Sequence, residues 1–235
     1  MPGNGNKGAR SLIMLNIFRP KISLIIPVYN QISSIEQSLR KISALPVSKE
    51  LIVIDDFSDD GSKELLKQLQ PELKLKLILH ALHRGRGAAI INGSAHAKGE
   101  FVMITESDPD TDFLYLTELI KLAELGKPDL MISGFIKQPF NFSRSVNSLL
   151  IRLLFGKKVY DAASVYKICR LSKFQTMHFD PAVKVLEVSW LLKALQRGMN
   201  LVEVELKSES HKKTGSVESG FAIMKEILTL RFSRK

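Results

Sequence analysis

The sequence lacks the features of three classes of protein: disulfide-bonded, membrane-spanning and secreted. It has a single cysteine, Cys169, among 235 residues, so an internal disulfide is excluded and a reducing compartment is favoured. No apolar run approaches the roughly 18 residues that a membrane-spanning helix needs. The longest candidates, 12–18 and 149–155, are short or contain a charge. Basic residues precede the first run but no small-residue cleavage site follows it, so we expect no secretory signal.

Acidic residues are scarce in three segments, 1–22, 140–160 and 211–235, which together carry a charge of +12, so the remaining residues sum to −2 and the net charge is +10. Basic segments can meet anionic lipid or nucleic acid, or serve solubility alone. Aromatic residues make up only 7% of the chain and no nucleic-acid-binding motif is present. We therefore expect no nucleic-acid partner, and salt-dependent binding to DNA or RNA would contradict this expectation.

The first three quarters of the chain alternate continuous apolar runs with amphipathic stretches, which predicts a mostly parallel, doubly wound α/β sheet with helices on both faces. The expected strands are 22–29, 50–56, 75–82, 100–106 and 129–135. In such sheets a ligand lies outside the carboxyl ends of the strands, so the candidate site lies where these runs stop.

Carboxylates follow two of the predicted strands and could meet in one cleft: Asp55 and Asp56 after the second, Glu106 and Asp108 after the fourth. Like charges repel unless a cation neutralises them, and oxygen ligands favour Mg²⁺ or Mn²⁺. In an extended E-S-D triplet, Glu106 and Asp108 point the same way. The alternative is that the second acid only caps the next helix.

The third predicted strand runs into H-R-G-R-G-A-A-I (83–90), in which Gly85 and Gly87 permit a tight turn. Arg84 and Arg86 add positive charge beside a helix N-terminus, which suits an anionic phosphate. The stretch is also similar to a dinucleotide fingerprint, but Ile90 replaces the third glycine. A phosphate loop of the G-x-x-x-x-G-K-S/T kind is absent. The alternative is that the glycines only make a turn.

Five segments, taken together and in order, resemble the family-2 glycosyltransferases of the GT-A fold, and within them the dolichyl-phosphate mannose synthase and polyprenyl-phosphate glycosyltransferase branch. They are SLIIPVYN (23–30), LIVIDDFSDDGS (51–62), HRGRGAAIINGSAHAKGEFVMITESD (83–108), VYDAASVYKICR (159–170) and EVSWLLKALQRGMNLVEVEL (187–206). We therefore expect a basic extension (1–21), a glycosyltransferase domain (22–210) and a basic loop with an amphipathic helix (211–235).

The resemblance implies a nucleotide-sugar donor and a role for each matching residue. Residues expected to bind the donor are Pro27, Tyr29, Asn30, Asp56, His83, Arg84, Gly85, Gly87, Glu106 and Ser107. Glu106 and Asp108 stand where the family holds Mg²⁺ or Mn²⁺. Asp108 and Asp161 are the expected catalytic acids, and Lys212 and Lys213 are candidates for a loop that closes over the phosphates. The alternative is that the last two belong to a flexible linker.

Several positions depart from the family pattern. Glu106 replaces the first Asp of the metal triplet, Gln31 a Glu, His83 an Asn and Val165 a Gly. The Q-x-x-R-W motif of processive enzymes is absent, so one sugar per acceptor is expected. The departures leave two alternatives open: a family member with another acceptor, or a catalytically silent relative that binds the nucleotide-sugar.

An amphipathic helix over about 141–156 carries an apolar stripe: Phe142, Val146, Leu149, Leu150, Leu153 and Leu154. Such a stripe often belongs to a core, but basic residues without acids favour a helix that lies on anionic lipid. Residues 221–232 repeat the pattern. In the resembling branch these helices lie on the bilayer, where the lipid phosphate enters. We expect Arg144, Arg152 and Lys167 to bind the acceptor phosphate.

The expected function is therefore inverting, metal-dependent transfer of one sugar from a GDP-mannose or UDP-hexose type of donor to a polyprenyl or dolichyl phosphate. The protein is expected to be peripheral, on the cytoplasmic side of the membrane, with or without an anchoring partner protein. A phosphate oxygen is already ionised near neutral pH, so this acceptor needs no general base. Positioning and charge neutralisation would then supply most of the catalysis.

Overall fold

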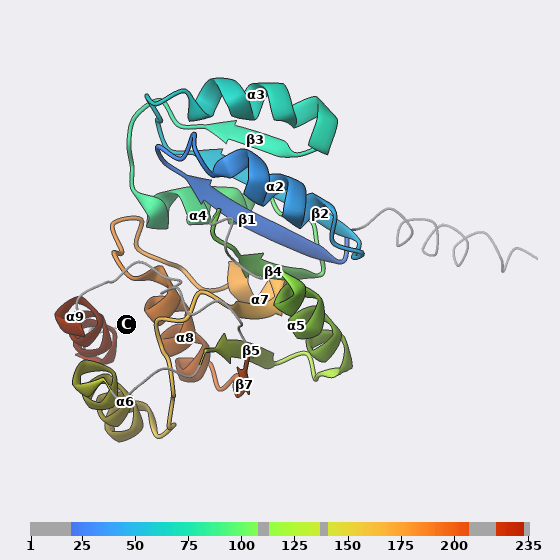
Figure 1. Cartoon of the computed structure of the whole chain (residues 1–235). Helices are drawn as coiled ribbons and strands as arrows, with labels where there is room; N and C mark the ends of the chain where they lie inside the picture. Colours follow the sequence, from blue (N-terminus) through green and yellow to red (C-terminus); the bar gives the residue numbers. More distant parts are fainter. Residues whose placement is uncertain (1–19, 108–112, 137–140, 207–219, 233–235) are drawn as a thin grey trace, which may run out of the picture.

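The computed structural model describes residues 20–107, 113–136, 141–206 and 220–232. Within them lies one seven-stranded sheet in the order β3-β2-β1-β4-β6-β5-β7 (Figure 1). The strands are β1 (Ile22–Val28), β2 (Lys49–Asp55), β3 (Lys76–Leu79), β4 (Phe101–Ile104), β5 (Leu130–Phe135), β6 (Lys167–Arg170) and β7 (Asn200–Glu205). The helices are α2 (Ile35–Ser43), α3 (Ser62–Leu73), α4 (Arg86–Ala95), α5 (Leu114–Leu125), α6 (Phe142–Phe155), α7 (Leu171–Gln175), α8 (Leu186–Gln196) and α9 (Gly220–Phe232).

All five predicted strands are present, and the mostly parallel α/β architecture is confirmed. β1 pairs in parallel with β2 and β4, and β2 pairs in parallel with β3. β3 ends earlier than predicted, at Leu79. The chain turns at His80, whose backbone N–H donates to the Asp55 carbonyl at 2.9 Å. This turn brings the loop 80–85 back over the end of β2.

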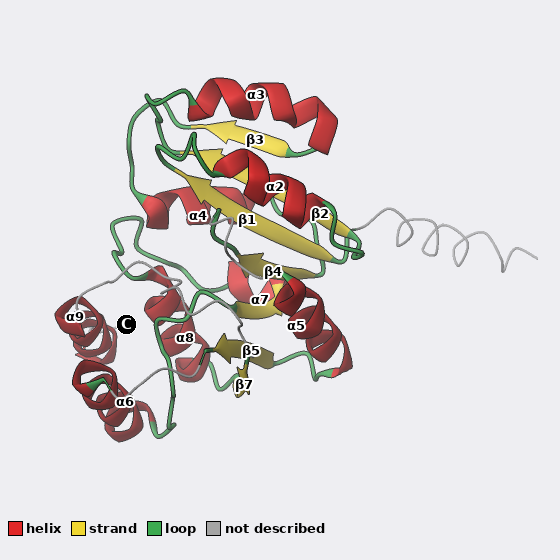
Figure 2. Cartoon of the chain, viewed as in Figure 1, coloured by secondary structure: helices red, strands yellow, loops and turns green. Residues whose placement is uncertain are grey.

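The second half of the sheet is less regular than the sequence pattern predicts. β6 runs antiparallel between β4 and β5, while β7 pairs in parallel with β5. Figure 2 shows β7 beside β5 at the edge of the sheet. No element is predicted from periodicity between residues 157 and 219, where the structure has β6, α7, α8 and β7. β6 has only four residues, too few for a periodic pattern, and α8 shows no clear amphipathic pattern because most of its side chains are buried.

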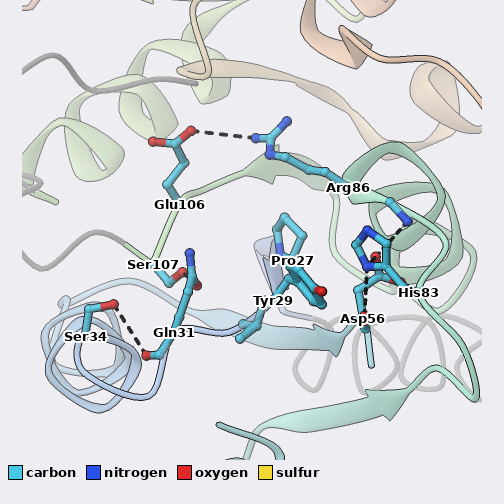
Figure 3. A pocket seen from close by; sticks show the side chains of 11 residues that line it. Pro27, Tyr29, Gln31, Ser34, Asp56, His83, Arg86, Glu106 and Ser107 are labelled. Carbon is cyan, nitrogen blue, oxygen red and sulfur yellow. Dashed lines mark hydrogen bonds and ion pairs between the residues drawn. The ribbon is translucent and has the colours of Figure 1, made fainter. Parts of the chain in front are cut away.

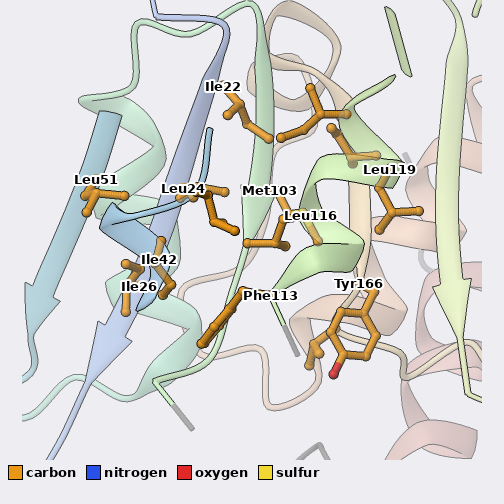
Figure 4. Packing of buried hydrophobic residues seen from close by; sticks show 14 of the residues in the cluster. Ile22, Leu24, Ile26, Ile42, Leu51, Met103, Phe113, Leu116, Leu119 and Tyr166 are labelled. Atoms are coloured by element: carbon orange, nitrogen blue, oxygen red, sulfur yellow. The ribbon is translucent and has the colours of Figure 1, made fainter. Parts of the chain in front are cut away.

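Helices cover both faces of the sheet, as expected for a doubly wound domain. Side chains alternate along β1: Ile22, Leu24 and Ile26 face α2, α3 and α5 (Figure 4), whereas Ile25 faces the side of α4, α7 and α8. Since both faces of the central strands are dry, their sequences are continuously apolar. The carboxyl ends of β1, β2 and β4 are therefore held rigidly beside one another.

The helix predicted over about 141–156 is present as α6, and its predicted apolar stripe is not fully buried in a core, so the expected contact of this stripe with lipid stays a prediction. Asn147 and Ile151 are its buried residues, while Phe142, Leu149 and Leu153 are 74%, 54% and 71% exposed. The helix is turned because it packs on α9 and α8, and the Asn147 amide donates to the Gly220 carbonyl at 3.4 Å.

The C-terminal helix, α9, lies beside α6 (Figure 1) and also leaves its predicted stripe outside. Its buried residue is Ile227, while Phe221, Leu228 and Phe232 are exposed. Among the described helices, none is long and apolar enough to cross a bilayer.

Candidate functional site

A cavity of about 500 Å³ lies at the carboxyl ends of β1, β2 and β4, where the sequence predicts the site (Figure 3). Its volume falls in the range of small-molecule sites. The lining residues are Pro27, Val28, Tyr29, Gln31, Ser34, Asp56, His83, Gly85, Arg86, Glu106 and Ser107. Seven of the predicted donor-binding residues are thus brought together: Pro27, Tyr29, Asp56, His83, Gly85, Glu106 and Ser107.

Asp56 forms the floor of one end of the cavity and is only 2% exposed. Its Oδ1 accepts from His80 Nδ1 at 2.7 Å and from the Arg84 N–H at 2.9 Å. Its Oδ2 accepts from the Gly85 N–H at 2.7 Å and lies 3.0 Å from His83 Nδ1. The carboxylate thus accepts three hydrogen bonds, while His83 Nδ1 hydrogen-bonds to the Asp56 backbone carbonyl at 3.2 Å. Asp56 therefore holds the loop 80–85 in place.

The charge of Asp56 is maintained by this loop. Burial alone would raise the pKa of Asp56, but the hydrogen bonds from His80, Arg84 and Gly85 and the charge of His83 together lower that pKa below its usual value. On the far side of His80, the Asn92 amide nitrogen lies 2.9 Å from Nε2. An amide nitrogen can only donate, so Nε2 accepts and Nδ1 carries the proton given to Asp56.

The exposed partner of Asp56 is His83, whose ring packs on the ring of Tyr29 with centroids 4.2 Å apart. Both side chains are about half exposed at the cavity wall. The ring pair offers an apolar, π-faced surface to a ligand.

The loops after β1 and β2 are joined by side-chain hydrogen bonds to backbone. Asn30 adopts a left-handed conformation (φ 52°), which Asn tolerates well, and its Oδ1 accepts from the Asp59 N–H at 3.0 Å. The Asn30 N–H in turn donates to Ser58 Oγ at 3.0 Å. The predicted donor-binding residue Asn30 does not line the cavity; its amide oxygen instead fixes the loop that carries Tyr29.

The end of β4 is anchored in the same way. The Ser107 hydroxyl donates to Gln31 Oε1, and the Ser107 carbonyl accepts from Ser38 Oγ at 2.7 Å. Ser107 is buried, yet both Ser107 and Glu106 line the cavity. The expectation that Glu106 and Asp108 point the same way stays a prediction, because Asp108 lies outside the described residues.

The two glycines of the H-R-G-R-G stretch have different roles. Gly85 caps α4 at φ 86°, and a Cβ added there would meet nothing within 4 Å, so its backbone faces open space in the cavity. A Cβ on Gly87 would lie 2.6 Å from the Val183 carbonyl oxygen. Gly87 therefore permits the approach of the chain at Val183, and neither Gly87 nor Arg84 lines the cavity.

Acidic groups at the strand ends are arranged differently from the predicted cluster. Asp55 is fully buried below the cavity, with Oδ2 accepting from the Ser58 N–H at 3.2 Å, so its predicted place in the cleft is wrong. Glu106 lines the cavity, and its Oε1 lies 3.9 Å from Arg86 Nη2. Asp108 lies outside the described residues. Within these residues, no three His, Cys, Asp or Glu side chains form a metal-binding group.

The segment around Asp161 and Lys167 is held by buried charges. The Glu203 carboxylate accepts from the Tyr160 N–H at 2.8 Å, and Asp161 Oδ1 accepts from the Ala163 N–H at 3.1 Å. Lys167 is completely buried, and its ammonium donates to the carbonyls of Ala162 (3.0 Å) and Ser164. Burial lowers the pKa of Lys167 to about 8.

The predicted contact of Lys167 with an acceptor phosphate is therefore incompatible with its position, because the ammonium faces the interior and is occupied by two carbonyls. The other predicted acceptor-binding residues, Arg144 and Arg152, lie on α6 and do not line the cavity. Lys212 and Lys213 lie outside the described residues.

Four residues that line the cavity were not among the predicted donor-binding residues: Val28, Gln31, Ser34 and Arg86. Val28 and Ser34 carry no sequence signal beyond their place near the end of β1, and Gln31 stands out only because it replaces the family's Glu. The only sequence signal for Arg86 is its positive charge beside the N-terminus of a predicted helix. Glu187 on α8 contacts Arg86 through its carboxylate. Its sequence signal is an acid within the otherwise apolar run of α8.

Comparison with known proteins places this cavity in context. Residues 23–183 match the family model described as Glycosyl transferase family 2. The undecaprenyl-phosphate 4-deoxy-4-formamido-L-arabinose transferases of Salmonella paratyphi A and Salmonella dublin are each 28% identical over 166 residues, 67% of this chain and 51% of theirs. The chain thus spans about half the length of the curated relatives it matches.

Solved structures are similar over nearly the whole chain. Glucosyl-3-phosphoglycerate synthase from Mycobacterium tuberculosis, in complex with Mn²⁺, UDP and phosphoglyceric acid, has a TM-score of 0.70 at 19% identity, covering 98% of this chain and 84% of that one. Its complex with Mn²⁺ and UDP-glucose gives a TM-score of 0.69. At this identity the likeness shows the fold alone.

Proposed function

The chain belongs to glycosyl transferase family 2 and has the GT-A fold, and on that premise we propose that it transfers one sugar from a nucleotide-sugar to a polyprenyl phosphate at a membrane surface. The observation that supports this most is the cavity itself, which combines an aromatic wall, a guanidinium and a carboxylate at the carboxyl ends of three strands. The Salmonella relatives, named for undecaprenyl phosphate, support the class of acceptor.

The donor would lie along the cavity from the Tyr29–His83 ring pair toward Glu106. The rings suit a nucleobase, since stacking buries apolar surface on both sides of a flat group. Gly85 leaves space at the N-terminus of α4, where the helix dipole and the Arg86 guanidinium favour the diphosphate. Arg84 would add charge from the loop, and its backbone N–H is held by Asp56.

A divalent cation fits the part of this donor set that is described. Glu106 presents carboxylate oxygens to the cavity, the ligand type that Mg²⁺ and Mn²⁺ prefer. We propose Glu106 and Asp108 as its protein ligands. When bound, the cation would stabilise the negative charge of the departing nucleoside diphosphate.

The acceptor phosphate would attack the anomeric carbon directly, with inversion, as expected for an in-line displacement. Its oxygen is ionised near neutral pH, so no residue has to remove a proton. Asp161, which lies on the loop that Glu203 and Lys167 hold rigid, is proposed to face the acceptor, and Lys212 and Lys213 to close over the phosphates. The protein would then act mainly by orienting charges that are already present.

The exposed side chains of α6 and α9 support binding to a membrane surface. Phe142, Leu149 and Leu153 on α6 are exposed, with Arg152 on the same helix also exposed. Apolar side chains that insert below anionic headgroups, next to a basic residue, are typical of interfacial helices. Such a site would bring the lipid-linked phosphate to the protein.

The transfer is tested with the purified chain, a panel of GDP- and UDP-sugars, a short polyprenyl phosphate, and Mg²⁺ or Mn²⁺. We expect one sugar per lipid in the extracted product for at least one donor. Glu106→Gln should lose most of this activity, whereas Glu72→Gln, which changes an exposed acid paired with Arg40, should not. No consumption of any donor by the wild type would refute the proposal.

Membrane binding is tested by sedimentation with vesicles rich in phosphatidylglycerol. The double variant Leu149→Ser/Leu153→Ser should bind at least about tenfold more weakly, since inserting one leucine contributes roughly 1.5–3 kcal/mol. The matched control is Leu125→Ser on α5, where a leucine is 87% exposed away from α6. Equal binding by both variants and wild type would refute a role for α6.

A further inference from the structure

One arginine of the cavity is held between two carboxylates from distant parts of the chain. Arg86, the first residue of α4, donates through Nη1 to Glu187 Oε1 on α8. Its Nη2 lies 3.9 Å from Glu106 Oε1, within ion-pair range but beyond a hydrogen bond (Figure 3 shows the Arg86–Glu106 pair). The guanidinium therefore has one occupied arm and one arm directed along the cavity wall.

The second arm lacks a hydrogen-bond acceptor. Nη2 is shielded from solvent and makes no hydrogen bond within the described part of the chain. Leaving a charged donor buried and unsatisfied is costly, so such a group signals a partner that arrives with a ligand. The guanidinium fork matches the spacing of phosphate oxygens, and Arg86 borders the cavity. The geometry thus suits an anionic oxygen of a bound phosphate.

Glu187 is placed to control this arm. Its side chain is 4% exposed, within a helix whose other side chains around it are buried and apolar. It cannot move away into solvent without disrupting that packing, so its carboxylate is a fixed anchor. Glu187 also acts electrostatically on the buried ammonium of Lys167, which links the anchor to the loop that carries Asp161.

We propose that Glu187 is a positioning residue that binds one arm of the Arg86 guanidinium and so aims the other arm at a phosphate oxygen in the cavity. This inference rests on the proposed function, because it requires the cavity to bind phosphate. The phosphate belongs either to the nucleotide-sugar diphosphate or to the acceptor. Glu187 itself touches neither.

The test compares ligands with and without phosphate on the full chain. Calorimetry measures the Kd of UDP and GDP, and of uridine and guanosine, with Mn²⁺ present, for the wild type, Glu187→Gln, Arg86→Gln and the double variant. We expect Glu187→Gln to weaken diphosphate binding about tenfold or more, as loss of a charge-assisted contact implies, and to leave nucleoside binding unchanged. The double variant should bind no more weakly than Arg86→Gln, because Glu187 acts through Arg86.

Steady-state kinetics with a short polyprenyl phosphate separates the two sources of phosphate. An unchanged Kd for UDP and GDP with a KM for the lipid raised about tenfold assigns the contact to the acceptor and supports the same positioning role. Glu187→Asp, which keeps the charge at a shorter reach, should recover part of the loss. It also serves as the second variant if Glu187→Gln does not fold.

The proposal would be overturned if Glu187→Gln had the same Kd for UDP and GDP and the same KM for the lipid as the wild type. It would also be overturned if the losses of diphosphate affinity in the two single variants added up in the double variant, or if nucleoside binding were weakened as much as diphosphate binding. The last result would mean that Glu187 only supports the fold. A wild type that binds diphosphate but transfers no sugar would refute the proposed function, but it would not contradict the positioning role of Glu187. A wild type that binds neither UDP, GDP nor the lipid phosphate would refute both.

Discussion

Replacing Asp56 with Asn is the sharpest perturbation of the loop that builds the cavity, because it keeps the size of the side chain and removes its charge. The carboxylate accepts from the Arg84 N–H on one oxygen and from the Gly85 N–H on the other. An amide has only one accepting oxygen. Whichever way the Asn amide turns, its NH₂ group faces one of these two N–H donors.

The cost follows from that geometry. One buried N–H without an acceptor costs about 1–3 kcal/mol, and the remaining bonds lose the contribution of an ionised acceptor, about 1 kcal/mol. We therefore expect the free energy of unfolding of Asp56→Asn to fall by about 2–4 kcal/mol. For a chain of this size that lowers Tm by roughly 4–16 °C.

Chemical and thermal unfolding followed by circular dichroism measure this difference, and Asp60→Asn is the matched control. Asp60 also accepts from two backbone N–H groups, those of Ile32 and Ser62, both at 2.9 Å, but at a partly exposed position. Water can replace the lost bonds there, so its cost should stay below about 1 kcal/mol. A loss for Asp56→Asn no larger than that for Asp60→Asn would refute the reasoning.

The pH dependence gives an independent check. The pKa of Asp56 is lower in the folded chain than in the unfolded chain, so its contribution to stability is complete above the unfolded pKa of about 3.9 and is lost as pH falls through the folded pKa. The stability difference between wild type and Asp56→Asn should therefore narrow as pH falls below about 4. A difference that stays constant to pH 2 would contradict the assigned shift.

Three further predictions concern other buried positions. Gly87→Ala should lower the free energy of unfolding by about 1–3 kcal/mol, measured by urea denaturation, because the new Cβ meets the Val183 carbonyl at 2.6 Å; an unchanged midpoint would contradict this contact. Burial lowers the pKa of Lys167 to about 8, so the unfolded chain binds more protons above that pH. The stability of the wild type relative to Lys167→Met should therefore rise between about pH 8 and 10.5, since the titration of Cys169 is common to both chains. Cys169 is buried and its pKa is raised to about 12, so a thiol reagent should label it only at the rate of unfolding; rapid labelling of the native protein would show that this region opens locally.

Elements with a strong local pattern can be read from the amino-acid sequence alone. The continuous apolar runs of β1, β2 and β4 and the helices between them follow from hydrophobic periodicity, and a parallel sheet places their carboxyl ends together. The cavity at these ends, with Tyr29, His83 and Glu106 on its wall, could therefore be predicted without coordinates. The resemblance to family-2 glycosyltransferases depends on the same segments.

The partner of each polar side chain, in contrast, depends on how the elements pack in three dimensions. Asp55 and Asp56 are neighbours in the sequence, yet Asp56 accepts hydrogen bonds from the loop 80–85 while Asp55 is buried beneath the cavity. The two differ because successive side chains of an extended chain point to opposite faces. Lys167 has the residue type of a phosphate ligand but faces carbonyls in the interior. The contact between Arg86 and Glu187 joins residues 101 positions apart. Periodicity reports which face of an element is apolar, whereas such pairings arise from the packing of one element on another.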